Sequence, residues 1–509
     1  MAWWLKNNIR MIQNNIRDID VRMDIDKQIE WLKSFGANTL QIGCGGITAF
    51  HPTKLDFQWQ NPYMEGDFFG EVLKKCHENG IRVIARFDFS KTHEKFYEEH
   101  PEWYFRGLDG KPVRYHDTVA TCVNGPYQSE RSLDIIREVM EQYPVDGIFF
   151  NMFGYITFDY SGNYVGICQC ENCKRRFREM YGEELPVKEN LEDPVFIKYI
   201  DFKKKTVDEM LTKIHNLARS INPDCAVSTY VTTGVDIVRN ESNSAVDRPL
   251  PFWIYNSSDN VGEIEGSYED KICSNCCINA VDLPYRFMGV SDQLNQIRLY
   301  GDLANGGTLD WCIIGNFDDY PDRENFDSVR KIFHYHKQYE QYYGHFSPKT
   351  KIMLVKEGDR RELCAEYRGI FRMLKETHLQ FTIVKADALK DKLAELDDYD
   401  YIILPDVHTL PDEVVKALGN TRAVVVGTGL TMDESDKCLK EVFGVEVSEK
   451  ITDVRGTYLK TMPEDVFADF AKTGKAWVFL DDPYRKMKLL PVTKGYLPLI
   501  EKTMFGPPE

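Results

Sequence analysis

The sequence lacks any long apolar run and any segment dense in lysine and arginine. No apolar stretch approaches the ~20 residues that a membrane-spanning helix needs, and the N-terminal MAWWLKNNIR has no apolar core of a secretory signal. The 509 residues carry 63 Lys plus Arg against 80 Asp plus Glu, a net charge of −17. This charge repels phosphate backbones and anionic lipid surfaces, so neither nucleic acid nor a membrane is an expected partner. We expect a cytoplasmic protein with a neutral or cationic small ligand.

Several familiar motifs are also missing. The chain contains no G-x-S-x-G elbow, no phosphate-binding P-loop and no G-x-G-x-x-G fingerprint. These absences argue against a serine hydrolase and against a nucleotide-dependent enzyme, and no organic cofactor is expected. The 13 cysteines are odd in number and spread over a long chain. That distribution argues for reduced thiols, some of them bound to metal, rather than for a disulfide framework.

What the sequence does contain is a repeated β-α pattern. Up to about residue 345, short apolar runs alternate with amphipathic stretches, which is typical of helices around a parallel sheet. Eight such units form a (β/α)₈ TIM barrel of class α/β, which we predict for residues 1–345. The eight predicted strands are 9–16, 38–44, 81–89, 146–151, 225–231, 252–256, 278–283 and 309–315.

A second α/β series follows the barrel. Strands are predicted at 351–355, 381–386, 399–406 and 423–429, with helices between them, so residues 350–475 should form an open flavodoxin-like domain. Residues 476–509 have the pattern of an incomplete third unit, which would fit a truncated chain.

Chemistry in a barrel of this type is expected at the C-terminal ends of the strands and in the loops that follow. These positions hold carboxylates, amides, cations and aromatic rings. They are Arg86 and Asp88 on the third strand, Asn151 with Tyr155 and Asp159 after the fourth, Asn256 and Asp259 after the sixth, Asp282, Tyr285 and Arg286 at the seventh, Asp310 and Trp311 on the eighth, and His51 after the second.

This mixture of groups suits a sugar, whose hydroxyls need hydrogen-bond partners and whose apolar face stacks on aromatic rings. Cleavage of a glycosidic bond needs two carboxyl groups on either side of that bond. We expect Asp159 to be the general acid, because Phe158 and Tyr160 beside it would raise its pKa. Asp259 or Asp282 would be the nucleophile or base. The alternative for each Asp is a helix N-cap or a partner for a neighbouring Arg.

The remaining candidates are assigned to substrate binding. Asn151 would bind a sugar hydroxyl, and Arg86, Arg286 and Lys91 would keep a carboxylate ionised. Asp310 would bind hydroxyls, as would Asp88, which is also the next catalytic candidate. Tyr155, Tyr285 and Trp311 would be stacking surfaces, and His51 would bind substrate or serve as a hydrogen-bonded structural residue.

The motif CQCENC places Cys168, Cys170 and Cys173 at C-x-C-x-x-C spacing. Three thiolates at this spacing can occupy three corners of a zinc tetrahedron, and Cys122 is the candidate for the fourth. The alternative is a set of unliganded thiols in a cytosolic loop. A second group, Cys273, Cys276 and Cys277, is a weaker candidate for metal binding.

Four motifs in one order carry a resemblance to a known family. HPEWYFRGLDGKP, TCVNGPY, DGIFFNMFGY and CQCENC resemble hypothetical glycosyl hydrolase family 6 and, more distantly, family 42 β-galactosidases and α-L-fucosidase-like barrels. The second domain resembles the β-galactosidase trimerisation domain, which is related to class I glutamine amidotransferases. The resemblance implies a glycoside hydrolase that forms a homo-oligomer, a dimer or a trimer. Because GTGLT at 427–431 has no Cys, the second domain would be a scaffold.

The resemblance also bears on individual residues. In family 42 enzymes a Cys before the fourth strand joins a C-x-C-x-x-C group to bind zinc, and Cys122 with Cys168, Cys170 and Cys173 match this pattern. Those enzymes end the fourth strand with Asn-Glu, and fucosidase-like barrels end it with Asp. Here Asn151 is followed by Met152, so this strand end has neither the Glu of the family 42 enzymes nor the Asp of the fucosidase-like barrels.

Three function classes follow. A glycoside hydrolase that cleaves a small oligosaccharide or glycoside is favoured, a non-catalytic sugar-binding barrel is the alternative, and a sugar lyase or isomerase is third. The arrangement of carboxylates around the pocket discriminates between them.

Overall fold

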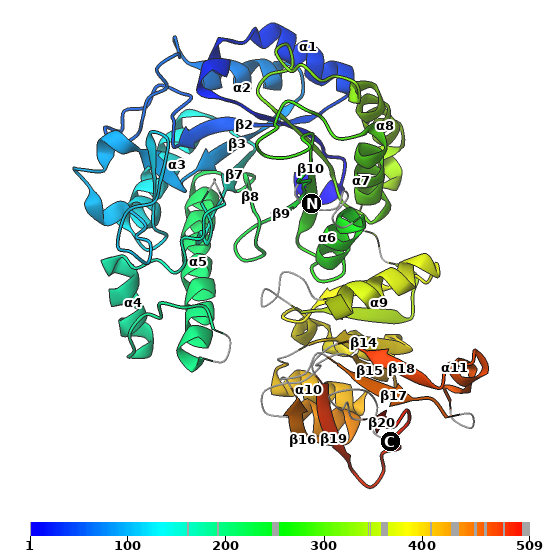
Figure 1. Cartoon of the computed structure of the whole chain (residues 1–509). Coiled ribbons are helices and arrows are strands. Elements are labelled where there is room, and N and C mark those ends of the chain that lie inside the picture. Colours follow the sequence, from blue (N-terminus) through cyan, green and yellow to red (C-terminus); the bar gives the residue numbers. More distant parts are fainter. Residues whose placement is uncertain are drawn as a thin grey trace. The chain divides into compact units, whose positions relative to one another are not determined.

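The computed structural model of the chain describes residues 2–159, 162–190, 193–246, 254–344, 346, 348–357, 365–407, 410–428, 437–451, 456–462, 466–481 and 484–500. The chain divides into two compact units, Met1–Phe346 and Ser347–Glu509 (Figure 1). No helix among these residues is long and apolar enough to cross a membrane.

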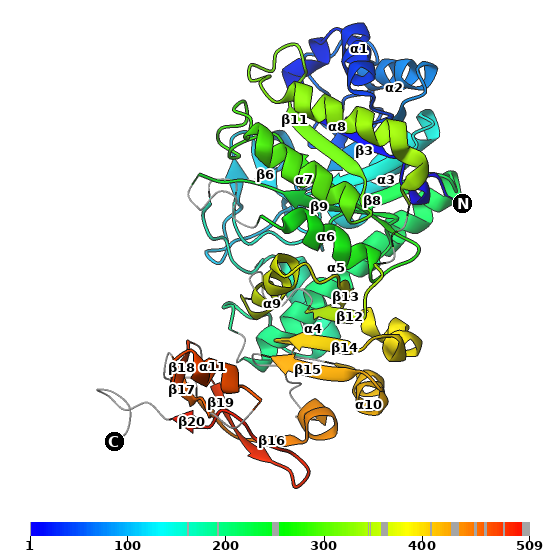
Figure 2. The ribbon, with the colours of Figure 1, turned by 90° about the vertical axis from the view of Figure 1, so that its right-hand side faces the viewer.

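The first unit is a closed barrel of eight parallel strands, as predicted. Around the barrel their order is β1-β11-β10-β9-β8-β7-β3-β2. The strands are β1 (Arg10–Asn15), β2 (Thr39–Gly46), β3 (Arg82–Asp88), β7 (Gly147–Asn151), β8 (Ala226–Thr229), β9 (Ile237–Ser242), β10 (Ile272–Ile278) and β11 (Leu309–Ile314). The helices of this unit are α1 (Ile25–Phe35), α2 (Phe68–Glu78), α3 (Ser132–Gln142), α4 (Glu171–Tyr181), α5 (Pro194–Ile221), α6 (Asn256–Glu265), α7 (Asp292–Ala304) and α8 (Phe326–Tyr339), several of which Figure 2 shows along the outside of the barrel.

Two predicted strands are wrong. The sixth strand is β9, not 252–256: Ile254 and Tyr255 form a turn, α6 begins at Asn256, and residues 252–253 lie outside the described part of the chain. The seventh strand, β10, ends at Ile278, where the predicted strand 278–283 begins. The reason is physical. Both true strands place polar side chains in the barrel interior, so neither is a continuous apolar run.

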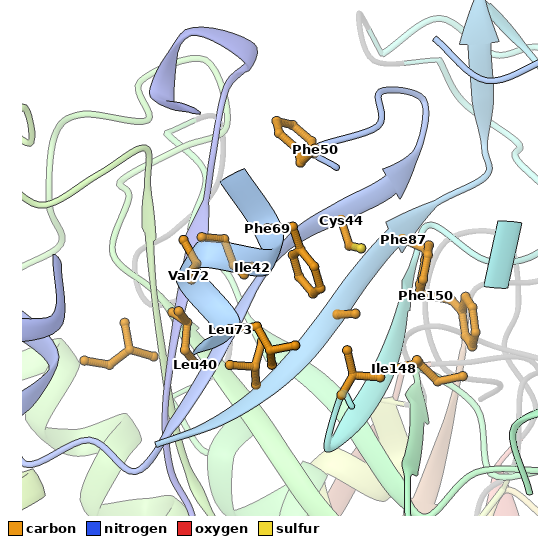
Figure 3. Packing of buried hydrophobic residues seen from close by; sticks show 14 of the residues in the cluster. Leu40, Ile42, Cys44, Phe50, Phe69, Val72, Leu73, Phe87, Ile148 and Phe150 are labelled. Carbon is orange, nitrogen blue, oxygen red and sulfur yellow. The ribbon is translucent and has the colours of Figure 1, made fainter. Parts of the chain in front are cut away.

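The helices begin and end where local chemistry requires. In α1 the Asp24 side chain accepts a hydrogen bond from the Lys27 N–H, and the helix stops at Gly36, whose φ of +75° is left-handed. The apolar faces of the helices pack on the outward side chains of the strands. In Figure 3, Leu40 and Ile42 of β2 lie near Phe69, Val72 and Leu73 of α2. Each such buried side chain contributes roughly 1.5–3 kcal/mol.

The barrel interior changes from apolar to polar along the strands. One closed cluster fills the end where the strands begin: Trp4, Ile9, Met11, Ile84, Phe149, Ala226, Ile237 and Ile272. Successive side chains of a strand point to opposite faces, so the next inward residue comes two positions later. These next residues include Arg86, Asn151, Ser228, Arg239 and Ser274. The C-terminal mouth of the barrel is therefore lined by polar groups.

Two long loops carry additional structure beside the mouth. The loop after β3 contains the antiparallel strands β4 (Lys91–His93), β5 (Arg114–Tyr115) and β6 (Thr118–Ala120). The segment after β7 leads to α4 and to the first turns of α5. Side chains from both form one hydrophobic cluster, which includes Phe105, Phe177, Tyr199 and Phe202.

The second unit contains a parallel sheet in the order β13-β12-β14-β15. Its strands are β12 (Ile352–Lys356), β13 (Thr382–Lys385), β14 (Tyr401–Pro405) and β15 (Val424–Thr428), with helices α9 (Ala365–Glu376) and α10 (Asp412–Asn420). After helix α11 (Ala468–Lys472), the strands β18 (Trp477–Leu480), β19 (Tyr484–Leu489) and β20 (Leu499–Ile500) pair with β16 (Val445–Ile451) and β17 (Thr457–Lys460). The boundary predicted at residue 475 thus falls between hydrogen-bonded strands. Residues 429–431 of GTGLT lie outside the described residues.

Candidate active site at the barrel mouth

Two carboxylates at the mouth are joined by a chain of hydrogen bonds. Asp88 ends β3, and its Oδ2 accepts a hydrogen bond of 2.7 Å from Asn151 Nδ2, at the end of β7. The Tyr230 hydroxyl, just after β8, lies 3.0 Å from Asn151 Oδ1 and 3.1 Å from Glu241 Oε1, on β9. These strands are neighbours in the barrel, so the arrangement spans one side of its mouth.

The Asp88 carboxylate accepts three hydrogen bonds. Its Oδ1 accepts hydrogen bonds from the Ser90 N–H at 3.0 Å and the Ser90 hydroxyl at 2.5 Å. Together with the Asn151 amide, three donors surround a side chain of which only 11% is exposed. Such donors stabilise a negative charge on the carboxylate.

Glu241 is a candidate site residue that the sequence reasoning missed. Its Oε2 accepts a hydrogen bond of 2.9 Å from Asn243 Nδ2, and Arg239 Nη1 lies 3.6 Å from Oε1. A quarter of its side chain, 25%, is exposed at the mouth. The signal that could have found it is the alternation Ile237, Arg239, Glu241, which marks the inward face of a strand with a polar end.

Tyr230 is held as a hydrogen-bond donor. Burial raises the pKa of Tyr230 well above its ordinary value, and the charge of Glu241 adds to this effect. The phenol therefore keeps its proton at neutral pH. One hydroxyl has one proton, so Tyr230 donates to either Asn151 or Glu241; the chain is continuous when Tyr230 donates to Asn151 and a protonated Glu241 donates to the phenol oxygen.

Asp310 lies below the mouth, not at it. It is the second residue of β11 and is fully buried. Its Oδ2 lies 2.8 Å from Arg239 Nε and accepts a hydrogen bond of 2.8 Å from the Ser274 hydroxyl. Arg239 Nη2 lies 3.3 Å from Oδ1. Asp310 thus neutralises a buried arginine, which corrects its predicted role in binding substrate hydroxyls.

The three other predicted catalytic carboxylates are not part of the network that joins Asp88 to Glu241, although Asp159 lines a pocket together with Ser90 and Lys91. Asp159 closes a turn, because its two oxygens accept hydrogen bonds from Asn163 N at 2.8 Å and Asn163 Nδ2 at 2.9 Å. Asp282 accepts hydrogen bonds from the backbone N–H groups of Val246 and Leu283. Asp259 is buried in the first turn of α6, a helix that begins where the predicted sixth strand was expected to end.

Two predicted substrate-binding residues also have structural positions. Trp311 is fully buried on the outer face of β11, where it packs on Phe35 and Phe326. His51 is fully buried, with Nε2 at 3.1 Å from Glu138 Oε2 and Nδ1 at 3.1 Å from the Cys44 carbonyl oxygen.

The tyrosines differ in their exposure. The Tyr155 hydroxyl lies 2.7 Å from both Asn124 Nδ2 and Thr206 Oγ1, inside the loop cluster rather than at an open surface. Tyr285 is 57% exposed in the loop after β10. In the same loop, Arg286 donates through Nε to the Leu283 carbonyl oxygen at 2.8 Å.

A pocket lies beside the mouth, between the strands of the β3 loop and the hairpin after β7. It is lined by Ser90, Lys91, Val113, Tyr115, Ala120, Met152, Ile156, Phe158 and Asp159. Its wall combines aromatic and aliphatic surface with a cation and polar groups, as sugar subsites do.

The four predicted metal ligands meet in one buried cluster, which confirms their grouping. The Sγ atoms of Cys122, Cys168, Cys170 and Cys173 all lie within 4.8 Å of one another. Cys122 Sγ is 3.4 Å from Cys173 Sγ, 3.4 Å from Cys170 Sγ and 3.8 Å from Cys168 Sγ. Bonds of about 2.3 Å to a tetrahedral zinc would place the sulfurs about 3.8 Å apart. The site therefore fits a metal ion of this kind.

Backbone and side-chain N–H groups also point at these sulfurs. Asn124 donates through its backbone to Cys122 Sγ at 3.3 Å and through Nδ2 to Cys173 Sγ at 3.2 Å. Such bonds stabilise thiolates around a cation. In contrast, Cys273, Cys276 and Cys277 are buried separately along β10 and are not among the described residues that form a metal-binding group.

Comparisons with known proteins point to glycoside hydrolases. Residues 24–152, which include Asp88 and Asn151, match the family model described as hypothetical glycosyl hydrolase 6. No curated protein matches the chain.

Three solved structures of similar fold are glycosidases by name. The α-L-fucosidase isoenzyme 2 from Paenibacillus thiaminolyticus superposes with a TM-score of 0.70 at 16% identity, over 94% of this chain and 72% of that one. The β-galactosidase from Bacillus circulans sp. alkalophilus gives a TM-score of 0.70 at 10% identity, over 94% and 81%. Gan42B, a GH42 β-galactosidase from G. stearothermophilus, gives 0.68 at 14% identity, over 95% and 80%. At these identities the likeness establishes the fold.

Proposed function

We propose that this protein is a glycoside hydrolase in which Asp88 and Glu241 cleave a glycosidic bond of a small oligosaccharide or glycoside. The observation that carries the proposal is the hydrogen-bonded chain Asp88–Asn151–Tyr230–Glu241 across the barrel mouth. It supplies two carboxyl groups separated by polar groups, and the match to a glycosyl hydrolase family covers the strands that carry Asp88 and Asn151.

The surroundings suggest a division of roles. Asp88, with three donors, acts as the ionised carboxylate that attacks the anomeric carbon or activates water. Glu241, the more exposed of the two, donates its proton to the leaving oxygen as the glycosidic bond breaks. With retention, Asp88 first forms a glycosyl-enzyme, and water then releases the sugar while Glu241 takes back a proton. A separation of ~5 Å implies retention and ~6.5–9.5 Å inversion, so the anomer of the product reports the geometry.

Substrate binding would involve the polar residues around this pair. Asn151 and Tyr230 would exchange their mutual hydrogen bond for bonds to a sugar hydroxyl, and Tyr285 and Arg286 would contribute from the loop after β10. Arg86 lies next to Asp88, with Nη2 at 4.0 Å from Oδ2.

The test is hydrolysis of α- and β-linked nitrophenyl glycosides and natural oligosaccharides by the wild type, Asp88→Asn and Glu241→Gln. These variants keep the shape but not the ionisable group, so each should lose at least ~10²-fold in turnover. Asp282→Asn is the matched control, because its carboxylate binds two backbone N–H groups, one in its own loop and one in the segment after β9. Sugar binding without hydrolysis of any substrate would favour a non-catalytic sugar-binding barrel.

We further propose that the four-cysteine cluster holds one structural zinc ion. Cys122 comes from the loop after β3, whereas the other three cysteines follow β7, so the ion would tie together the two loops beside the mouth. A site closed by four cysteines leaves no position for substrate.

Elemental analysis of protein purified without added metal should give one zinc per chain. Cys170→Ser should lower that content, while Cys225→Ser, at a buried cysteine outside the cluster, should not. Unchanged metal content in Cys170→Ser would contradict this assignment.

The assembly into a homo-oligomer through the second unit also stays a proposal. It is supported by the likeness to β-galactosidases over both units, and sedimentation of the full chain at micromolar concentration tests it. A monomer would remove it.

A further inference from the structure

Three cationic side chains belong to the strands and loops around the mouth. Arg86 points into the barrel from β3, Lys91 begins β4 just beyond that strand, and Arg286 comes from the loop after β10. Lys91 is only 8% exposed, and its Nζ donates to the Ser90 hydroxyl at 3.3 Å. Burial lowers the pKa of Lys91, Asp88 opposes this effect, and the charges of Arg86 and Arg286 lower it further.

Arg86 has few partners for an arginine whose side chain is only 15% exposed. Its Nη2 lies 4.0 Å from Asp88 Oδ2, which is beyond hydrogen-bond distance, and its buried Nε has no hydrogen-bond partner among the described residues. Arg239, which points into the same barrel, binds Asp310 at 2.8 Å through Nε. A guanidinium N–H that is buried without an acceptor costs free energy, and the more exposed N–H groups of Arg86 are open to a ligand that supplies acceptors.

The cations at the mouth differ in the acceptors they have. Arg239 and Asp310 neutralise each other, which leaves Arg86, Lys91 and Arg286. The carboxylates nearby are Asp88 and Glu241, with Asp159 in the pocket that Lys91 also lines and Asp282 in the loop of Arg286. Asp159 and Asp282 already accept hydrogen bonds from neighbouring N–H groups. Among the described residues, Arg86 is thus left without an acceptor at hydrogen-bond distance.

Resting on the proposed function, we infer that the sugar bound at the mouth carries an anionic group and that Arg86 binds this group. A carboxylate, a sulfate or a phosphate on the sugar ring supplies the oxygens that the guanidinium lacks. The planar fork of arginine suits such oxyanions, because it donates two parallel hydrogen bonds. Lys91 and Arg286 add to the attraction without being required as direct ligands.

The experiment measures the binding of matched sugars to the full chain by calorimetry. Galacturonate is compared with galactose, and glucuronate with glucose, since each pair differs only at C6. Galactose 6-sulfate and glucose 6-phosphate identify which oxyanion is preferred. We expect at least one anionic sugar to bind ~10-fold or more tightly than its neutral partner at low salt, and the ratio to shrink as salt is added.

Arg86→Met should abolish this ratio, and Arg86→Lys should restore part of it, which also covers the case in which the first variant folds poorly. Arg82→Met is the matched control: it removes the same charge from the start of the same strand, where the guanidinium lies 4.8 Å from the Trp3 ring centroid. This control should keep the ratio of the wild type.

Equal binding of neutral and anionic sugars to the wild type would overturn the inference. It would also be overturned if Arg86→Met weakened both members of a pair equally, since Arg86 would then only position Asp88. A different outcome would contradict the proposed function. If the anionic sugars bind selectively and neither glucuronides, galacturonides nor neutral glycosides are cleaved, the inference stands and the hydrolase does not.

Discussion

The two ends of the barrel interior are built from the same strands but from opposite chemistry. On β3 the inward residues run Ile84, Arg86, Asp88, and on β9 they run Ile237, Arg239, Glu241. The end where the strands begin is a closed apolar cluster, whereas the end where they finish is a network of charges and amides. On each strand, four positions along the chain lead from a residue in the region that stabilises the fold to a residue in the region that we propose performs the chemistry.

Between these two ends lies a layer of the barrel interior that contains a buried ion pair. Arg239 and Asp310 are buried together, with 1% and 0% of their side chains exposed. Replacing such a pair with apolar residues is often neutral or stabilising, so stability alone does not explain it. Its position directly below Glu241 suggests that it supports the mouth, because Arg239 Nη1 also lies 3.6 Å from Glu241 Oε1.

The largest effect should come from breaking that middle layer. Asp310→Ala leaves the Arg239 charge buried without its partner, so we expect unfolding to become easier by about 3–5 kcal/mol. Denaturant unfolding followed by circular dichroism measures the change. The double variant Asp310→Leu with Arg239→Met is the control and should recover much of the loss. No recovery would mean that the layer is not an isolated charge pair.

The apolar end should respond in stability alone. Ile272→Ala removes buried volume from the cluster that includes Trp4 and Ile237, which should cost on the order of 2–4 kcal/mol. Turnover at a temperature where the variant is folded should stay near that of the wild type. A large loss of turnover in the folded variant would erase the distinction between the two ends.

The same end contains a histidine that should make stability depend on pH. His336 of α8 is fully buried, with Nε2 at 3.2 Å from the Asn7 carbonyl oxygen. Burial and the charge of Arg10 lower the pKa of His336 to about 4, which the Asn7 carbonyl and Glu340 only partly oppose. Its Nδ1 is buried with no hydrogen-bond partner among the described residues, so a proton there would be unsatisfied.

The pKa of His336 is lower in the folded state than its ordinary value. The stabilisation that comes from burying this histidine in its neutral form is therefore fully present above pH ~6.5, and it is lost as the pH falls toward 4. Between pH 7.5 and 5 the wild type should lose about 2 kcal/mol through this group. His336→Gln should flatten the profile, and His334→Gln, at an exposed histidine of the same helix, should not. Identical profiles in all three proteins would contradict the assignment.

The smallest effect concerns the bridge at the mouth. Tyr230→Phe removes the hydroxyl between Asn151 and Glu241 and should change stability by only about 1 kcal/mol. Turnover should fall by about tenfold, which corresponds to the same energy, because Glu241 loses a positioning partner. The expected signature is a shift of the pH–rate profile, which a purely structural role would leave in place.

Sequence reasoning was most accurate for features that follow from the periodicity of apolar residues or from the spacing of a motif. The alternation of apolar runs with amphipathic stretches predicted the barrel, and the C-x-C-x-x-C spacing with Cys122 predicted the cysteine cluster. It was wrong where a polar strand faced the barrel interior. Residues 237–242 contain Arg239, Asn240 and Glu241, so an apolar-run criterion passed over β9 and with it Glu241.

The side of a strand that a residue faces was equally decisive. Asp310 and Trp311 are adjacent in sequence, yet Asp310 points into the barrel and Trp311 points outward to Phe35 and Phe326. One residue of register separates the two environments, and depth along the strand separates Asp310 from the mouth. Neither property follows from residue type, so Asp310 and Trp311 were both assigned to substrate binding.

The most direct test of the account is chemical rescue of Asp88→Ala and Glu241→Ala with azide, on a nitrophenyl glycoside that the wild type cleaves. The account predicts that each variant loses at least ~10²-fold in turnover, and that azide restores turnover in at least one of them by entering the space of the lost carboxylate and forming a glycosyl azide. Near wild-type turnover in either variant without azide would contradict the claim that Asp88 and Glu241 are the catalytic pair.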